Sequence, residues 1–184
     1  GTLAELQAWA EEDPRFRVLS RPHRGVIDAA NTALSACRAP YLARMDADDR
    51  VHPERLAKQA TYLDEHPQVA VVSSLVRMFP AEDVQEGFRI YVRWLNALVS
   101  HEDICREIFV ESPLPNPSVM IRKTWLDKVG GYQEHKWPED YDMWLRFYLA
   151  GARFAKIPQV LLYWRDHADR LTRTDSRYSV KNFL

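Results

Sequence analysis

Residues 41–49 read YLARMDADD, a short apolar run that stops abruptly in three carboxylates. A strand that ends this way delivers acidic side chains to one edge of a sheet, where open α/β sheets bind their ligands. Asp46 and Asp48 are two residues apart, so both side chains can reach the same point in extended or turn geometry. Crowded carboxylates repel one another unless a cation lies between them. The stretch therefore predicts a site where a divalent ion bridges to a phosphate.

A plainer interpretation of these acids stays open. Aspartate is common in turns and helix caps, where its carboxylate accepts backbone N–H bonds, so an Asp-x-Asp pair alone is weak evidence for a metal. Two rival sites are excluded. A calcium-binding EF-hand loop needs an oxygen ligand at the position of Arg50 and a glycine at that of Val51. An aspartyl-phosphate phosphohydrolase would have Thr or Val two places after Asp48, where Arg50 stands.

The composition limits the class of protein. At 184 residues the chain is long enough for one domain with its own core, and its formal net charge of −1 comes from interspersed acids and bases. That balance is not the electrostatic footprint of a nucleic-acid-binding protein. The most apolar stretches, 69–76 and 157–164, are too short to span a bilayer. Cys37 and Cys105 have no partner at zinc-ligand spacing, so we expect reduced thiols in a cytoplasmic protein.

Outside the acidic stretch, apolar residues alternate between helical and strand spacing. Before the stretch we predict helices at 2–10 and 26–37 with a strand at 15–19, and after it a helix at 53–66 and a strand at 69–76. Helices between consecutive strands are typical of parallel crossovers. The first half of the chain therefore predicts an α/β fold.

The second half of the chain follows a different pattern. Residues 80–112 predict one or two amphipathic helices that form an insertion or cover. A strand at 118–122, a helix that opens at 137–140 and ends at Gly151, and a final strand at 157–164 follow. No repeat or low-complexity linker divides the chain, so we predict a single domain, 1–184, with the helical insertion at about 80–112.

Glu139 and Asp140 form a second acidic pair, in the first turn of the predicted helix. The helix dipole favours acids at this position, so capping alone can explain them. Together with the acids at 46–49, however, they have the composition of an active site that combines a metal with a base.

Four segments, in this order, resemble the family 2 glycosyltransferases, which are inverting enzymes of GT-A fold. They are GVIDAAN at 25–31; YLARMDADD at 41–49 with PERL at 53–56; PSVM at 117–120 with GGY at 130–132; and PEDYD at 138–142 with WLR at 144–146. Together they extend over most of the chain. The resemblance implies an α/β, GT-A-like (Rossmann-like) sheet that is mixed, mostly parallel and flanked by helices.

The resemblance also assigns roles to the acids. Asp46 and Asp48 match the family's Asp-x-Asp motif, which holds Mg²⁺ or Mn²⁺ and, through Asp46, the ribose of the nucleotide sugar. Asp140 matches the general base, which takes a proton from the acceptor hydroxyl in a single in-line displacement. Glu139 is then the partner of that base.

Basic residues near both ends of the chain complete the implied site. The segment 164–167 resembles the stretch where family members present a His or Arg to the metal or the diphosphate. His167 is the better match, and Arg165 is second. Arg24 joins these residues as an expected contact of the donor.

The implied function is a metal-dependent hexosyltransferase that moves a sugar from a nucleotide-sugar donor, most simply a UDP-sugar, to a glycan or lipid-linked acceptor in bacterial cell-surface polysaccharide synthesis. The alternative is a non-catalytic module that binds a nucleotide sugar or a glycan, and such a module has no use for a base. We expect no nucleic-acid partner. Peripheral association with the inner face of the membrane and a homodimer stay open. Family members begin with strands that bind the nucleotide base, which this chain, starting at Gly1, is expected to lack.

Overall fold

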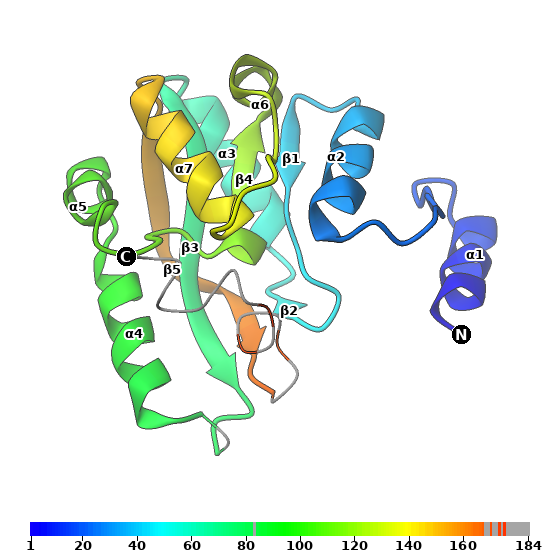
Figure 1. Cartoon of the computed structure of the whole chain (residues 1–184), viewed down its shortest axis with the longest axis horizontal. Coiled ribbons are helices and arrows are strands. Elements are labelled where there is room, and N and C mark those ends of the chain that lie inside the picture. The colour runs from blue at the N-terminus through cyan, green and yellow to red at the C-terminus, as the bar shows by residue number, and fades with distance from the viewer. Residues whose placement is uncertain (83, 168–169, 171–172, 174, 176–184) are drawn as a thin grey trace. The chain divides into compact units, whose positions relative to one another are not determined.

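The computed structural model describes residues 1–82, 84–167, 170, 173 and 175 (Figure 1). The chain forms two compact units, residues 1–37 and residues 38–184. The boundary between them lies just before the YLARMDADD stretch. The single-domain organisation stays a prediction.

The first unit consists of two helices joined by an irregular segment. Helix α1 spans Thr2–Glu12, and α2 spans Val26–Ala36. The predicted strand at 15–19 is wrong: this unit contains no strand among its described residues, and a strand needs a partner for its backbone hydrogen bonds. Among the apolar residues of this segment, Phe16 is half exposed and its ring lies 6.0 Å from the ring of Trp9 on α1.

The second unit is built on a five-stranded sheet with the order β1-β4-β3-β5-β2. Its strands are β1 (Tyr41–Ala43), β2 (Arg50–Val51), β3 (Val69–Phe79), β4 (Met120–Arg122) and β5 (Arg153–Arg165). The long strands β3 and β5 are parallel neighbours, and the short strands pair antiparallel with the strands beside them. Strand β2, which directly follows the acidic stretch, is thereby held against the end of β5.

The sheet is mixed, as expected, but the expectation of a mostly parallel sheet is wrong. Of the four pairings among the described strands, only β3 with β5 is parallel. Strands β1 and β3 do run in the same direction, since both are antiparallel to β4. They are not neighbours, because β4, which forms later in the chain, lies between them. Helix and strand alternation predicts the direction of successive strands but not which later strand is inserted.

Helices flank this sheet (Figure 1). They are α3 (Arg55–Glu65), α4 (Glu86–Ala97), α5 (His101–Glu107), α6 (Lys123–Val129) and α7 (Glu139–Leu149), with a 3-10 turn at Asn116–Ser118. Helix α3 packs Leu63 against Val72 of β3, and α4 packs Leu95 against Val76 of β3. Each leucine buried in this way contributes about 2 kcal/mol to folding. No helix in the described part of the chain is both long and apolar enough to cross a membrane.

The end of α4 rests on a buried lysine of β5. Lys156 is 2% exposed, and its ammonium donates to the Leu95 carbonyl at 2.5 Å, in the last turns of α4. The helix dipole favours a cation there. Burial nevertheless lowers the pKa of Lys156 to about 7. The charged form of a side chain is therefore destabilised in this part of the interior.

Candidate active site

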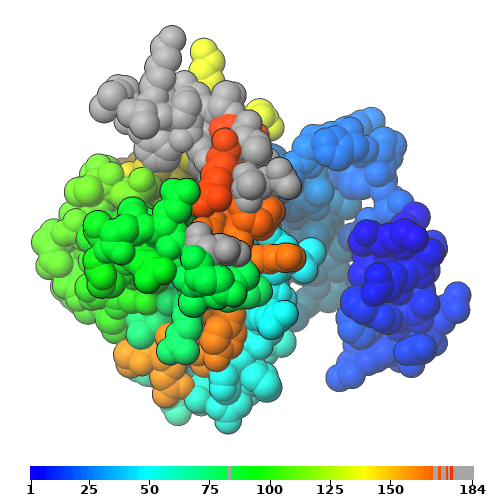
Figure 2. All heavy atoms as spheres, turned by 90° about the horizontal axis from the view of Figure 1, so that it is seen from below, coloured from blue at the N-terminus to red at the C-terminus, as the bar shows by residue number. Residues whose placement is uncertain are grey.

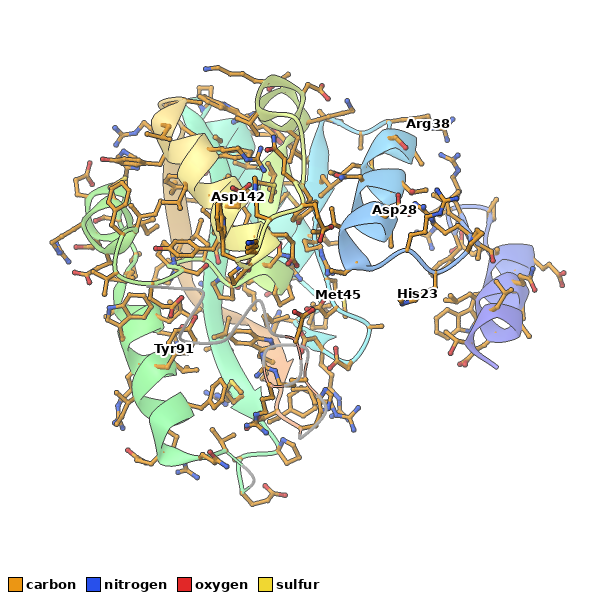
Figure 3. The ribbon with its side chains drawn as sticks, in the orientation of Figure 1. His23, Asp28, Arg38, Met45, Tyr91 and Asp142 are labelled. Atoms are coloured by element: carbon orange, nitrogen blue, oxygen red, sulfur yellow. The ribbon has the colours of Figure 1, made fainter. Side chains whose placement is uncertain are left out.

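The acidic stretch forms a tight loop immediately after β1. The Arg44 N–H donates a hydrogen bond to the Val119 carbonyl at 3.0 Å. The Asp49 N–H donates to the Asp46 carbonyl at 3.3 Å, which closes a turn. Met45 marks this loop in Figure 3. Because β2 follows at once, the acids are held between the end of β1 and the start of β2.

Asp48 contacts a histidine from the far end of the chain. The Nε2 atom of His167 lies 3.0 Å from Asp48 Oδ2, although 119 residues separate the two in sequence. Both side chains are partly exposed, 41% for Asp48 and 36% for His167, so a ligand can reach them. The pairing of β2 with β5 explains the contact, since Asp48 precedes β2 and His167 follows β5.

Asp46 has a different partner. Its carboxylate pairs with the guanidinium of Arg44 at 2.6 Å. Within residues 1–82, 84–167, 170, 173 and 175, no three His, Cys, Asp or Glu side chains converge as a ready-made metal site. The expected set of Asp46, Asp48 and His167 is therefore not brought to one point. The role of Asp46 toward the metal or the ribose stays a prediction.

The pair of Asp48 and His167 nevertheless suits a hard divalent cation. Carboxylate oxygen is a preferred ligand of Mg²⁺ and Mn²⁺. Neutral imidazole is the commonest metal ligand among side chains. Such ions usually bind through one or two protein groups together with the phosphates of a substrate, rather than in an all-protein cage. A site with only these two donors in contact is therefore chemically sufficient.

Asp49 behaves unlike its two acidic neighbours. It is 6% exposed, and its Oδ1 accepts the backbone N–H of Arg165 at 2.8 Å. Burial, reinforced by the charges of Asp46 and Asp48, raises the pKa of Asp49 to about 6 against the effect of this hydrogen bond. The third acid therefore follows the turn-and-cap interpretation. It ties the loop to the end of β5, two residues before His167.

Arg55, to which the sequence assigned no role, anchors the start of the acidic loop. It is 1% exposed, and its Nη2 donates to the carbonyls of Arg44 at 2.7 Å and Val119 at 3.2 Å. Its Nε donates to Gln59 Oε1 at 3.0 Å. Burial lowers the pKa of Arg55 to about 10, so the guanidinium stays charged at neutral pH. The PERL segment at 53–56 was the available signal, but a motif does not say which carbonyls an arginine meets.

The second acidic pair lies in the first turn of α7. Asp140 Oδ1 accepts the Tyr141 N–H at 2.9 Å, although the N-cap residue itself is Pro138, which makes no side-chain cap. Burial and the charge of Glu139 raise the pKa of Asp140 to about 7, and the charge of Asp46 adds to this effect. A carboxylate with this pKa exists in both protonation states near neutral pH, as a general base must.

A third acid of the same turn has a structural role. Asp142 (Figure 3) pairs with the Arg146 guanidinium at 2.7 Å and with His135 Nε2 at 3.3 Å. Arg146 in turn donates to the Val129 carbonyl at 2.7 Å. Asp142 therefore fastens α7 to the segments that precede it.

Arg44 connects the two acidic sites. Burial acts to lower the pKa of Arg44, but Asp46 and the nearby Tyr132 hydroxyl more than offset it. Tyr132 is 4% exposed, and its hydroxyl donates to Asn116 Oδ1 at 3.0 Å. Burial raises the pKa of Tyr132, and the charge of Asp140 adds to this effect. The half-buried Arg44 and the buried Tyr132 thus interact electrostatically with acids of both sites.

The other two basic residues predicted to bind the donor are Arg24 and Arg165. Arg24 lies in the irregular segment before α2, in the first unit, next in sequence to His23, which Figure 3 labels. Arg165 is the last residue of β5, and its side chain is exposed while its N–H is bonded to Asp49. Binding of the donor by either side chain remains a prediction.

Sequence comparisons identify relatives along most of the chain. The family model described as "Glycosyl transferase family 2" matches residues 1–130. The amylovoran biosynthesis glycosyltransferase AmsE of Erwinia amylovora is 31% identical over 90% of this chain and 59% of its own length. The O-antigen biosynthesis glycosyltransferase WbnJ of Escherichia coli is 26% identical over 98% of this chain and 71% of its own length.

A solved structure shares the fold. The mannosyltransferase PcManGT from Pyrobaculum calidifontis, in complex with GDP-Man and Mn²⁺, matches 92% of this chain with a TM-score of 0.65 and 19% identity. The chain spans 45% of that structure and 59% of the Erwinia relative. The fold of this chain is therefore shared by longer glycosyltransferases.

Proposed function

The chain belongs to glycosyltransferase family 2, and from this we propose that it transfers a hexose from a nucleotide-sugar donor to an acceptor hydroxyl, with inversion at the anomeric carbon. The observation that carries the proposal is the contact of Asp48 with His167, 3.0 Å apart at the end of β5. Two groups with metal-binding chemistry meet there while both remain accessible.

The proposed site separates binding from chemistry. Asp48 and His167 would hold Mg²⁺ or Mn²⁺, which neutralises the charge that develops on the departing nucleoside diphosphate. Asp140 accepts the proton of the acceptor hydroxyl as its oxygen attacks the anomeric carbon. Burial keeps the pKa of Asp140 high, and the like charge of Glu139 adds to that effect. We assign Asp46 to the donor, where Arg44 holds its carboxylate in place.

The proposed substrates follow from chemistry and from the relatives. Two relatives are named for amylovoran and O-antigen biosynthesis, which supports a role in bacterial polysaccharide synthesis. We propose a nucleotide-sugar donor and a glycan or lipid-linked acceptor. The solved relative holds GDP-Man, so the UDP-sugar that we expect needs a direct test. A cytoplasmic location, peripheral membrane association and a homodimer stay predictions.

The test uses the full-length protein. Nucleoside diphosphate release is measured for a panel of UDP- and GDP-sugars with Mn²⁺, with and without a glycan acceptor fraction. We expect one donor to give release that depends on acceptor and is abolished by EDTA. Donor binding without any turnover over the whole panel would instead support the non-catalytic binding module.

A further inference from the structure

The segment that carries His167 is fastened by two arginines that follow it in sequence. Asp166 is 4% exposed, and its carboxylate lies 2.9 Å from Arg173 and 3.8 Å from Arg170. Arg173 also donates to the His167 carbonyl at 3.1 Å. On the other side, the Asp166 N–H donates to the Phe79 carbonyl, at the end of β3, at 2.8 Å. The backbone that presents the His167 imidazole is therefore held by these ion pairs and hydrogen bonds.

Both arginines lie on the aromatic ring of one residue of α4. The guanidinium carbon is 5.5 Å from the Phe88 ring centre for Arg170 and 5.2 Å for Arg173. Arg170 also lies 4.5 Å from the ring centre of Trp164, on β5. In Figure 2 the surface of α4, in green, lies beside that of the end of β5, in orange. The helix at 86–97 thus contacts the active-site segment through Phe88.

This geometry matches the chemistry of arginine. A planar guanidinium can stack on an aromatic face and still direct its N–H groups sideways to a carboxylate. Arg173 does both, with Phe88 on one side and Asp166 at the edge of the fork. Arg170 is also near enough to Asp48 and Asp49 for their charges to act on it. A lysine would offer a point charge without this combination.

We propose that Phe88 is a positioning residue, whose ring orders Arg170 and Arg173 and through them places His167 at Asp48. The inference rests on the proposed function, because it gives the His167 segment the task of holding a metal and a diphosphate. It also gives the helical insertion at about 80–112 a role beyond that of an insertion or cover. Outer groups of this kind orient the ligands of a metal and tune its affinity.

The test compares variants of the full-length protein. Phe88→Leu keeps an apolar side chain but removes the aromatic face, whereas Phe88→Tyr keeps that face. Ile90→Ala, on the same helix and 55% exposed in the parent, is the control for the helix itself. Calorimetry with Mn²⁺ in the presence of UDP or GDP measures metal affinity, and donor KM is measured alongside.

We expect Phe88→Leu to weaken Mn²⁺ affinity about tenfold and to raise donor KM, the usual scale for loss of an outer positioning group. Phe88→Tyr and Ile90→Ala should bind Mn²⁺ as the parent does. If Phe88→Leu is poorly folded, Arg173→Lys, which keeps the charge and removes the planar fork, should show the same loss. Asp48→Asn is the reference. Parental affinity in Phe88→Leu or Arg173→Lys, alongside a loss in Asp48→Asn, overturns this inference alone; parental affinity in Asp48→Asn overturns the proposed metal site as well.

Discussion

The acidic loop after β1 and the first turn of α7 both contain aspartates, but the surroundings of these aspartates differ. In the loop, Asp46 pairs with Arg44, and Asp48 contacts His167 in a partly exposed position. In the helix, Asp140 accepts a backbone N–H and has a like charge next to it. The loop acids have cationic or metal-binding side chains beside them, which suits binding of an ion. The helix acid has a raised pKa, which suits uptake of a proton.

The largest effect is expected at the helix acid. Asp140→Asn should lower kcat by about a hundredfold or more while donor affinity stays near the parental value, since only a general base is lost. Steady-state transfer and donor titration measure the two effects separately. Glu139→Gln should reduce kcat less. Near-parental turnover in Asp140→Asn would return this pair to the capping role.

Replacement of the loop acid Asp48 should affect metal binding first, in contrast to the replacement of Asp140. Asp48→Asn keeps the shape of the side chain and removes the charge that a divalent cation requires, so Mn²⁺ affinity should fall at least about tenfold. Calorimetry with a nucleoside diphosphate present measures this. Asp127→Asn is a matched control, because Asp127 is an exposed acid of α6 paired with Lys123. A fall of equal size in the control would show a general charge effect.

The raised pKa of Asp140 predicts a pH dependence of transfer. Because Asp140 must be ionised to accept a proton and its pKa is about 7, kcat/KM should fall about tenfold per pH unit below pH 7. Glu139→Gln removes the like charge, so its midpoint should move to lower pH. Transfer assays from pH 5 to 9 measure both profiles. A profile that is flat down to pH 5 would place the base elsewhere.

The smallest effect tests burial itself, at a site away from the chemistry. Burial gives Lys156 a pKa of about 7 in the folded protein, against the ordinary lysine pKa of 10.5 in the unfolded chain. Between these values the unfolded chain binds one proton more, so this lysine makes stability rise with pH, by up to about 1 kcal/mol per unit. Below pH 7 Lys156 is protonated in both the folded and the unfolded state, so burial of its charge destabilises the folded state to the full extent.

Lys156→Met should therefore stabilise the protein at pH 7 and remove that part of the pH dependence. Urea unfolding at pH 7, 8 and 9 measures the difference between parent and variant. A constant difference over this range would mean that Lys156 keeps an ordinary pKa, and would weaken the case that burial sets the pKa of Asp140 as well.

Part of the fold and of the site could be predicted from local patterns. Helical periodicity places α2, and the first turn of α7 is correctly predicted to contain Glu139 and Asp140. The strand at 15–19 is wrong, because alternation reports packing of Phe16 as readily as pairing of a strand. The mostly parallel sheet is wrong because the place of β4 depends on non-local pairing.

The residues that sequence reasoning missed share one feature. Arg55 contacts the Val119 carbonyl and Phe88 contacts Arg173, and both of these partners are distant in the sequence. Motifs select residues by chemistry that touches a ligand, whereas these two hold other residues in place. Asp49 shows the reverse case, since it belongs to the motif yet serves as a tie between the loop and β5.

Residue type and local spacing were enough to select the acids at 46–49 and the pair at 139–140 as candidates, whereas His167 was selected only through the resemblance of 164–167 to the family. Which of these groups contact one another depends on the tertiary structure. Asp48 contacts His167 because β2 pairs with β5 across the second unit. Asp46 pairs with the partly buried Arg44 instead of contacting that histidine. The tertiary structure also raised the pKa of Asp140, since desolvation is a property of the surroundings and not of the residue.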